Sequence, residues 1–173
     1  MQRRYVIGLS IAAAGLVGWY AFRPERLLID ERVDESFPVA ASKASAPTAM
    51  SAPAGATPMA LASGSFHGQA HETKGMAAIY QLEEGKRVLR LTDFETSNGP
   101  DVRVYLVAAS DVTDNDTVKK SGFVELGKLK GNIGAQNYDV PADVDLARYR
   151  SVTIWCRRFG VNFGTAPLTA PRS

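Results

Sequence analysis

An uninterrupted apolar run lies near the N-terminus of this chain and sets the strongest restriction on its structure. Residues 5–22 read YVIGLSIAAAGLVGWYAF and contain no charged side chain. As an α-helix, a run of this length spans roughly 27 Å, which is enough to cross the hydrocarbon core of a bilayer. We therefore predict that residues 5–22 form a transmembrane signal anchor that contacts the lipid bilayer and takes no part in the core of a folded domain.

The charges and side chains that flank this run predict its orientation and its fate. Two arginines lie within residues 1–4, and a short N-terminus of this kind favours the cytoplasmic side. A cleaved signal peptide is the alternative, and it would end in small residues. This run ends in the bulky rings of Trp19, Tyr20 and Phe22. We therefore expect an uncleaved single-pass anchor in the cell membrane, with the rest of the chain extracytoplasmic, either periplasmic or extracellular.

Composition divides the remainder of the chain into three parts. Residues 23–35 form a juxtamembrane segment of mixed charge, expected as a helical extension of the anchor or as a turn lying on the surface. Residues 36–63 are rich in alanine, serine and proline, with Lys43 as their only charge, so they cannot bury enough apolar surface to offset the entropy of ordering. We predict a flexible linker there and a folded domain over residues 64–169.

The charge of the predicted domain excludes one class of function. Between Gly64 and Thr169 there are 13 Lys or Arg residues and 13 Asp or Glu residues, with no basic stripe. Because binding to phosphate backbones depends on clustered positive charge, nucleic acid is not expected as a partner.

The pattern of the domain predicts an all-β fold, either a sandwich or a barrel. Residues 87–94 and 102–107 alternate apolar and polar side chains, and the turn cluster Asn98-Gly99-Pro100 separates them. Further short segments rich in β-branched and aromatic residues follow, up to residues 152–159. Apart from an expected turn at residues 142–149, no long helical periodicity is present, which is typical of sandwiches and barrels.

Cys156 is the only cysteine of the chain, and its chemistry is left open by the sequence. Cysteines of exported proteins usually pair in disulfides, but this one has no partner within the chain. Alternation along the strand places it with Val152 and Ile154 on an apolar face, while Trp155 and Arg157 share the opposite face. It is therefore either a small buried side chain without reactivity or a thiol that ligates a cofactor or exchanges electrons.

Other residues with reactive side chains do not assemble into an evident catalytic set. His67 and His71 are four residues apart in a glycine-rich segment without a third nitrogen or sulfur ligand nearby, so a metal site is not expected. Asp93 and Asp101 flank the turn at residues 98–100. Such carboxylates cap turns more often than they perform acid–base chemistry, and no nucleophile with a base accompanies them. An enzyme is therefore the less favoured interpretation.

The order of several short motifs resembles a known family. These motifs are Gly64-Ser-Phe66, Asp93-Phe94, Asn98-Gly-Pro-Asp101, Val104-Tyr-Leu106, Leu126-Gly-Lys-Leu-Lys-Gly131, Asn137-Tyr138 with Pro141, and Val152-Thr-Ile-Trp-Cys156 with Phe159. Together they resemble the electron-transfer DM-thirteen domain family over nearly all of residues 64–168, with the anchor and linker outside the match.

The resemblance implies a β-sandwich and a redox role for the cysteine that Cys156 matches. That cysteine would act as a bare thiol or as a ligand to a prosthetic group such as haem, and His71 could occupy the place of an early histidine of the family. Since the chain has no CxxCH motif, a haem would be held non-covalently. We expect a tethered electron-transfer domain with an electron-transfer or envelope partner. The alternative is a binding module that presents Trp155 and Arg157, with the neighbouring Asp101, while Cys156 is only a core residue.

Overall fold

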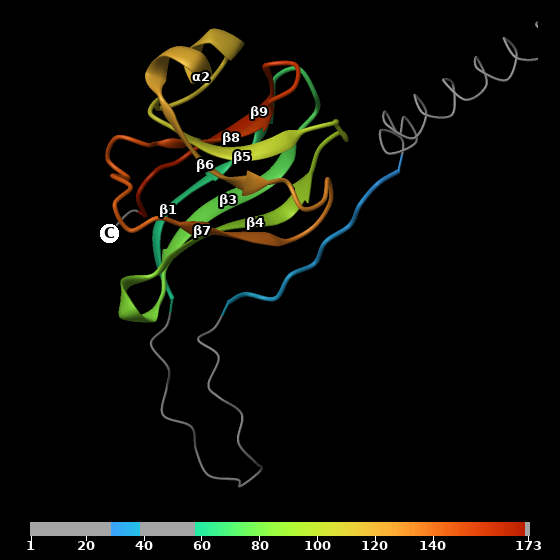
Figure 1. Cartoon of the computed structure of the whole chain (residues 1–173). Helices are drawn as coiled ribbons and strands as arrows, with labels where there is room; N and C mark the ends of the chain where they lie inside the picture. The colour runs from blue at the N-terminus through green and yellow to red at the C-terminus, as the bar shows by residue number, and fades with distance from the viewer. Residues whose placement is uncertain (1–28, 39–57, 172–173) are drawn as a thin grey trace, which may run out of the picture.

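The chain forms short strands because apolar and polar side chains alternate along its segments and glycine-rich turns separate them. The computed structural model describes residues 29–38 and 58–171, which contain two antiparallel sheets packed face to face (Figure 1). The four-stranded sheet has the order β1-β3-β4-β7, with bounds Met59–Ser65, Lys74–Gln81, Arg87–Glu95 and Gln136–Val140. The five-stranded sheet has the order β2-β9-β8-β5-β6, with bounds His67–Gly68, Val161–Pro167, Ser151–Cys156, Val102–Val107 and Phe123–Lys128. These two sheets confirm the mostly-β prediction.

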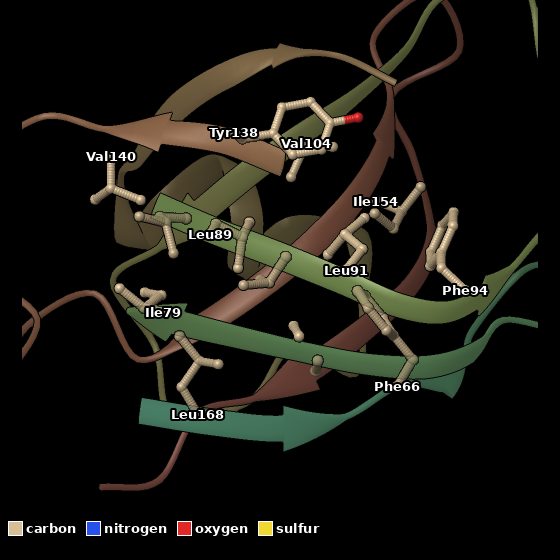
Figure 2. Close-up of a cluster of buried hydrophobic side chains, with 14 of the residues drawn as sticks. Phe66, Ile79, Leu89, Leu91, Phe94, Val104, Tyr138, Val140, Ile154 and Leu168 are labelled. Atoms are coloured by element: carbon tan, nitrogen blue, oxygen red, sulfur yellow. The ribbon is translucent and has the colours of Figure 1, made fainter. Parts of the chain in front are cut away.

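The core lies between the two sheets, where the inward-facing side chains of each strand meet (Figure 2). Leu89 and Leu91 of β4 have no exposed area, and neither do Val104 of β5 and Ile154 of β8, which lie opposite each other in the register. Burying one such side chain stabilises the fold by about 1.5–3 kcal/mol. The alternation read from residues 87–94 and 102–107 therefore identified the correct inner faces.

A second, smaller cluster lies on the outer face of the five-stranded sheet. The helix α2, Asn115–Ser121, begins where the Asp114 carboxylate accepts a hydrogen bond from the Thr117 backbone N–H at 2.7 Å. Its Val118 is 1 % exposed and packs with Tyr105 and Trp155. The sequence predicted no helix here, because α2 has a single buried position and so shows no periodicity. The expected turn at residues 142–149 is present, with the Tyr149 N–H bonded to the Asp145 carbonyl at 2.9 Å.

The N-terminal boundary of the sandwich differs from the sequence-based expectation. The expected linker included residues 59–63, but these belong to β1, which pairs with β3 from Met59 onward. At the other end of β1, a Cβ on Gly64 would lie 1.8 Å from the Pro167 carbonyl oxygen. Glycine is therefore needed where β1 approaches β9. The 3-10 turn η2, Glu83–Gly85, connects β3 to β4.

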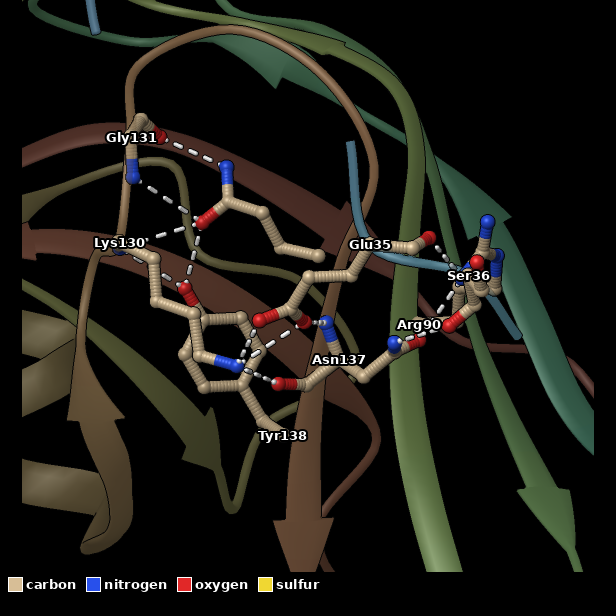
Figure 3. Close-up of polar contacts among 8 residues, drawn as sticks. Glu35, Ser36, Arg90, Lys130, Gly131, Asn137 and Tyr138 are labelled. Carbon is tan, nitrogen blue, oxygen red and sulfur yellow. Dashed lines mark hydrogen bonds and ion pairs between the residues drawn. The ribbon is translucent and has the colours of Figure 1, made fainter. Parts of the chain in front are cut away.

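Residues 29–38 form an extended segment, here called the strap, that lies along the chain leading into β7 (Figure 1). The Val33 N–H donates to the Ile133 carbonyl at 2.9 Å and the Glu35 N–H to the Ala135 carbonyl at 2.8 Å. In Figure 3 the Glu35 carboxylate meets the Lys130 ammonium, and the two lie 2.7 Å apart. Part of the expected juxtamembrane segment thus pairs with the domain through an isolated parallel bridge between Arg32 and Ile133, which neither a helical extension nor a free surface turn describes.

No helix within residues 29–38 and 58–171 is long and apolar enough to cross a membrane. The anchor predicted at residues 5–22 lies outside the described residues.

Candidate functional site

Cys156 ends β8, and its side chain points into the core. It pairs with Val102 of β5 and Val161 of β9, and it has no exposed area. Its neighbours in the buried cluster are apolar, among them Ile154 and Phe163. Because a thiol needs access to react with another thiol or an alkylating agent, the native fold shields this sulfur from direct attack.

The two arginines that follow Cys156 do not lie where they could stabilise a thiolate at its sulfur. The Arg157 Nε donates to the Asp101 carboxylate at 2.8 Å, and its backbone N–H donates to the Asp101 carbonyl at 2.8 Å. Its side chain therefore lies on the outer face of the sheet, as strand alternation predicts, while Arg158 is exposed in the turn beyond. A cation that stabilised a thiolate would have to approach the sulfur, and Arg157 is bound elsewhere.

Asp101 is the centre of an ionic cluster that also contains Arg103, Glu125 and Arg157. The Arg103 Nε lies 2.6 Å from the Asp101 carboxylate, and the Arg103 Nη1 lies 2.8 Å from the Glu125 carboxylate. Burial raises the pKa of Asp101, but the hydrogen bonds and positive charges of Arg103 and Arg157 outweigh it and lower the pKa below its ordinary value. The carboxylate thus binds two arginines instead of capping the turn, and it is poorly suited to take up a proton.

This cluster predicts a pH dependence of stability. The pKa of Asp101 is lower in the folded chain than in the unfolded one, so its contribution is complete above the unfolded pKa and is lost as the pH falls through the folded pKa. We expect Asp101→Asn to be less stable than the wild type at neutral pH, with the difference shrinking below about pH 4. Urea unfolding at a series of pH values measures this. Asp143→Asn, at an exposed position, is the control, and an Asp101→Asn deficit independent of pH would contradict the prediction.

Trp155 lies on the outer face of β8 as expected, but it is not available for recognition. Its ring is only 6 % exposed, because α2 and the segment before it cover the sheet there. It stacks on Tyr105 with ring centroids 6.4 Å apart, and Tyr105 stacks on Phe123 at 4.3 Å with an angle of 3° between the rings. The expectation that Trp155 and Arg157 form an exposed binding surface is therefore wrong for Trp155.

Trp155, Tyr105 and Phe123, here called the aromatic row, connect the strand that bears Cys156 to the surface. Trp155 is the residue before Cys156, and Phe123 at the other end is 46 % exposed. Burial raises the pKa of Tyr105, with a smaller contribution in the same direction from the Glu125 charge, so this phenol stays protonated at neutral pH. Tyr105 and Phe123 carry no functional motif in the sequence, although the alternation of β5 and β6 places both on the outer face.

The two histidines have different partners. The His67 Nε2 lies 2.8 Å from the Asp111 carboxylate, whereas the His71 ring packs on Phe163 with centroids 3.9 Å apart. Within the described ranges, no three side chains of the metal-ligating types gather into a group that could hold an ion. His71 is thus placed beside Phe163, a member of the same buried cluster as Cys156.

A haem does not fit the surroundings of Cys156 in this fold. An axial ligand must present its atom to a cavity that holds the macrocycle. The Cys156 side chain has no exposed area, and Val102, Ile154 and Phe163 are packed in the same cluster. The expectation of a haem ligated by Cys156 and His71 therefore finds no support in the packing, and we derive no chemistry from it.

Comparison with known proteins identifies the family. The sequence pattern of the family described as Electron transfer DM13 matches residues 65–168, well over half of the 173-residue chain. No curated protein and no solved structure matches the chain. The matched range includes Cys156, the ionic cluster and the aromatic row, and it excludes the strap. On this match, the chain belongs to the Electron transfer DM13 family.

Proposed function

We propose that this chain is a membrane-tethered, extracytoplasmic electron-transfer domain in which Cys156 is the redox-active group. Family membership indicates a redox-related role. The observation that carries the assignment to Cys156 is its position directly after Trp155, so that one peptide unit of β8 joins the buried thiol on the inner face to the indole on the outer face. Trp155 in turn stacks toward the surface through Tyr105. Stacked aromatic rings can pass an electron between a buried group and a partner at the surface.

The burial of the sulfur favours one-electron chemistry over thiol–disulfide exchange. Exchange requires a second thiol to reach the sulfur, and Cys156 has no exposed area. In the proposed step, the Cys156 S–H loses one electron and one proton. The electron passes through Trp155 and Tyr105 to a one-electron oxidant that binds over Phe123 at the surface. The proton reaches water when the fold opens transiently around Cys156, and a one-electron donor together with a proton from water reverses the step. In an oxidising compartment, the same burial would protect the lone thiol from mixed disulfides.

The test is a stopped-flow titration of the full chain in nanodiscs with hexachloroiridate(IV), a one-electron oxidant. We expect an oxidation phase that Cys156→Ala abolishes and that Tyr105→Phe slows, because phenylalanine is much harder to oxidise. Cys156→Ala keeps the fold, at a cost of about 1–2 kcal/mol for the small cavity. Oxidant consumption by Cys156→Ala equal to that of the wild type would contradict the proposal.

The second candidate is a non-catalytic binding or envelope-interaction module in which Cys156 only fills the core. The apolar surroundings of Cys156 favour this reading, since a free cysteine packs well as a small apolar side chain. Under this alternative, Cys156→Ala loses some stability and nothing else. An enzyme is not proposed, because the carboxylate of Asp101 is engaged by Arg103 and Arg157.

A further inference from the structure

The strap is attached to the sandwich by side chains as well as by backbone pairing. The Asn137 backbone N–H and the Lys130 ammonium both donate to the Glu35 carboxylate, at 2.7 Å each (Figure 3). The Arg90 guanidinium donates to the Glu35 carbonyl at 3.1 Å and also lies over the Phe37 ring, 5.6 Å from its centroid. These contacts hold residues 29–38 in one place relative to the sheets.

The strap starts at one particular end of the sandwich. The Asn98 side-chain amide donates to the Ile29 carbonyl at 2.7 Å, and the Asn132 side-chain amide donates to the Asp30 carboxylate at 2.8 Å. Asn98 belongs to the turn between β4 and β5, so Ile29, where the described part of the strap begins, lies beside this turn.

Covalent geometry then limits how far this end can lie from the bilayer. Only residues 23–28 separate the predicted anchor from Ile29. Even fully extended, the seven steps from Phe22 to Ile29 reach at most about 25 Å. The long alanine-, serine- and proline-rich segment lies after the strap in the chain, so its length does not extend this reach.

The turn from β8 to β9 lies at the same end of the sandwich. Its first residue, Arg157, donates its backbone N–H to the carbonyl of Asp101, which directly follows the β4–β5 turn. The turn carries Arg158, which is exposed, and Phe159, which is 68 % exposed. Gly160 completes it with a φ of +64°, and Lys119 of α2 lies close to that glycine.

We propose that this end, formed by Ile29, Arg158 and Phe159 and here called the tip, rests on the lipid headgroups of the bilayer that residues 5–22 span. Ile29 is 61 % exposed, so two large apolar side chains and a guanidinium face outward near the anchor. Aromatic side chains favour the membrane interface, and basic ones are attracted to anionic headgroups. The tip would fix the domain in one orientation, with the strap as its support. This inference rests on the membrane tether of the proposed function.

The experiment places an environment-sensitive label at the tip of the full chain. Phe159→Cys, in a Cys156→Ala background, is labelled with the fluorophore NBD and reconstituted in vesicles of equal parts phosphatidylcholine and phosphatidylglycerol. The matched control is a label at Asp143→Cys. This exposed position follows β7, whose Val140 pairs with Arg87 at the opposite end of the sandwich.

We expect the label at position 159 to show blue-shifted emission and quenching by brominated lipid, while the label at position 143 shows neither. Adding Arg158→Glu should lower the equilibrium constant between the headgroup-bound and the free orientation at least about five-fold, since each basic residue near an anionic surface contributes roughly that factor. Adding Asn98→Ala and Glu35→Ala, which release the strap, should also reduce it.

Equal spectra at positions 159 and 143 would overturn the inference. Flotation of the chain with the vesicles and its resistance to carbonate extraction test the tether separately. A chain that floats with equal spectra at both labels keeps the tether and refutes the tip contact, whereas a chain that does not float refutes both. Neither result bears on the oxidation of Cys156, which is measured by a different assay.

Discussion

Replacing Gln136 by leucine is expected to lower the free energy of unfolding by about 3–5 kcal/mol, because several buried polar groups lose their partner at once. Gln136 has no exposed area, and its carbonyl oxygen accepts hydrogen bonds from the Tyr138 hydroxyl at 2.7 Å and from the Lys130 N–H at 3.1 Å. Its amide donates to the Gly131 carbonyl at 2.7 Å. Leucine fills a similar volume but leaves the Tyr138 hydroxyl proton and the Gly131 carbonyl without a partner, while the Lys130 N–H keeps the Tyr138 hydroxyl oxygen as an acceptor at 3.2 Å.

The Gln136→Leu substitution should also weaken the attachment of the strap to the domain. Lys130 and Gly131, the partners of Gln136, begin the loop on which the strap lies, and Lys130 also holds Glu35 (Figure 3). Urea unfolding gives the stability, and hydrogen exchange of the Val33 and Glu35 amides reports on the strap. Asp139→Asn, an exposed change in the same strand, is the control and should stay within about 0.5 kcal/mol of the wild type. A Gln136→Leu variant as stable as this control would contradict the role given to Gln136.

Trp155→Ala is expected to lower the free energy of unfolding by about 3–5 kcal/mol, since it removes a large ring from a packed cluster. The ring lies between the sheet and the cover formed by α2, where it contacts the cluster of Tyr105, Val107, Val112 and Val118. Because Val118 is the only buried residue of α2, the helix depends on this cluster for its attachment. The backbone amides of residues 115–121 should exchange hydrogen faster in the variant than in the wild type. The increase should exceed what the lower global stability alone would cause, because α2 detaches locally.

Two further variants test whether the effect of Trp155→Ala comes from the loss of buried packing. Phe159→Ala removes an aromatic ring from the same hairpin, but that ring is 68 % exposed, so the change should stay within about 0.5 kcal/mol of the wild type. Trp155→Phe keeps part of the packing and should fall between the wild type and Trp155→Ala. If Trp155→Ala and Phe159→Ala lower the free energy of unfolding equally, the packing of Trp155 under α2 does not stabilise the fold as proposed.

Local pattern was sufficient for the inner faces of the strands. In β4, β5 and β8, every second side chain is apolar on the core side, so Leu91, Val104 and Cys156 could all be assigned to the interior from the sequence. The same rule put Trp155 and Arg157 on the outer face. The alternation along a single strand, however, does not predict which segment of the chain packs on its outer face.

The mostly-β class, the family and the inward direction of Cys156 could thus be inferred from the order of the residues. Three contacts could not: α2 buries Trp155, Asp101 binds Arg103 and Arg157, and the strap pairs with the chain before β7. The difference lies in the range of the interactions. Alternation and turn chemistry act between neighbours in the chain, whereas these three contacts join segments distant in sequence, whose pairing depends on how the two sheets pack.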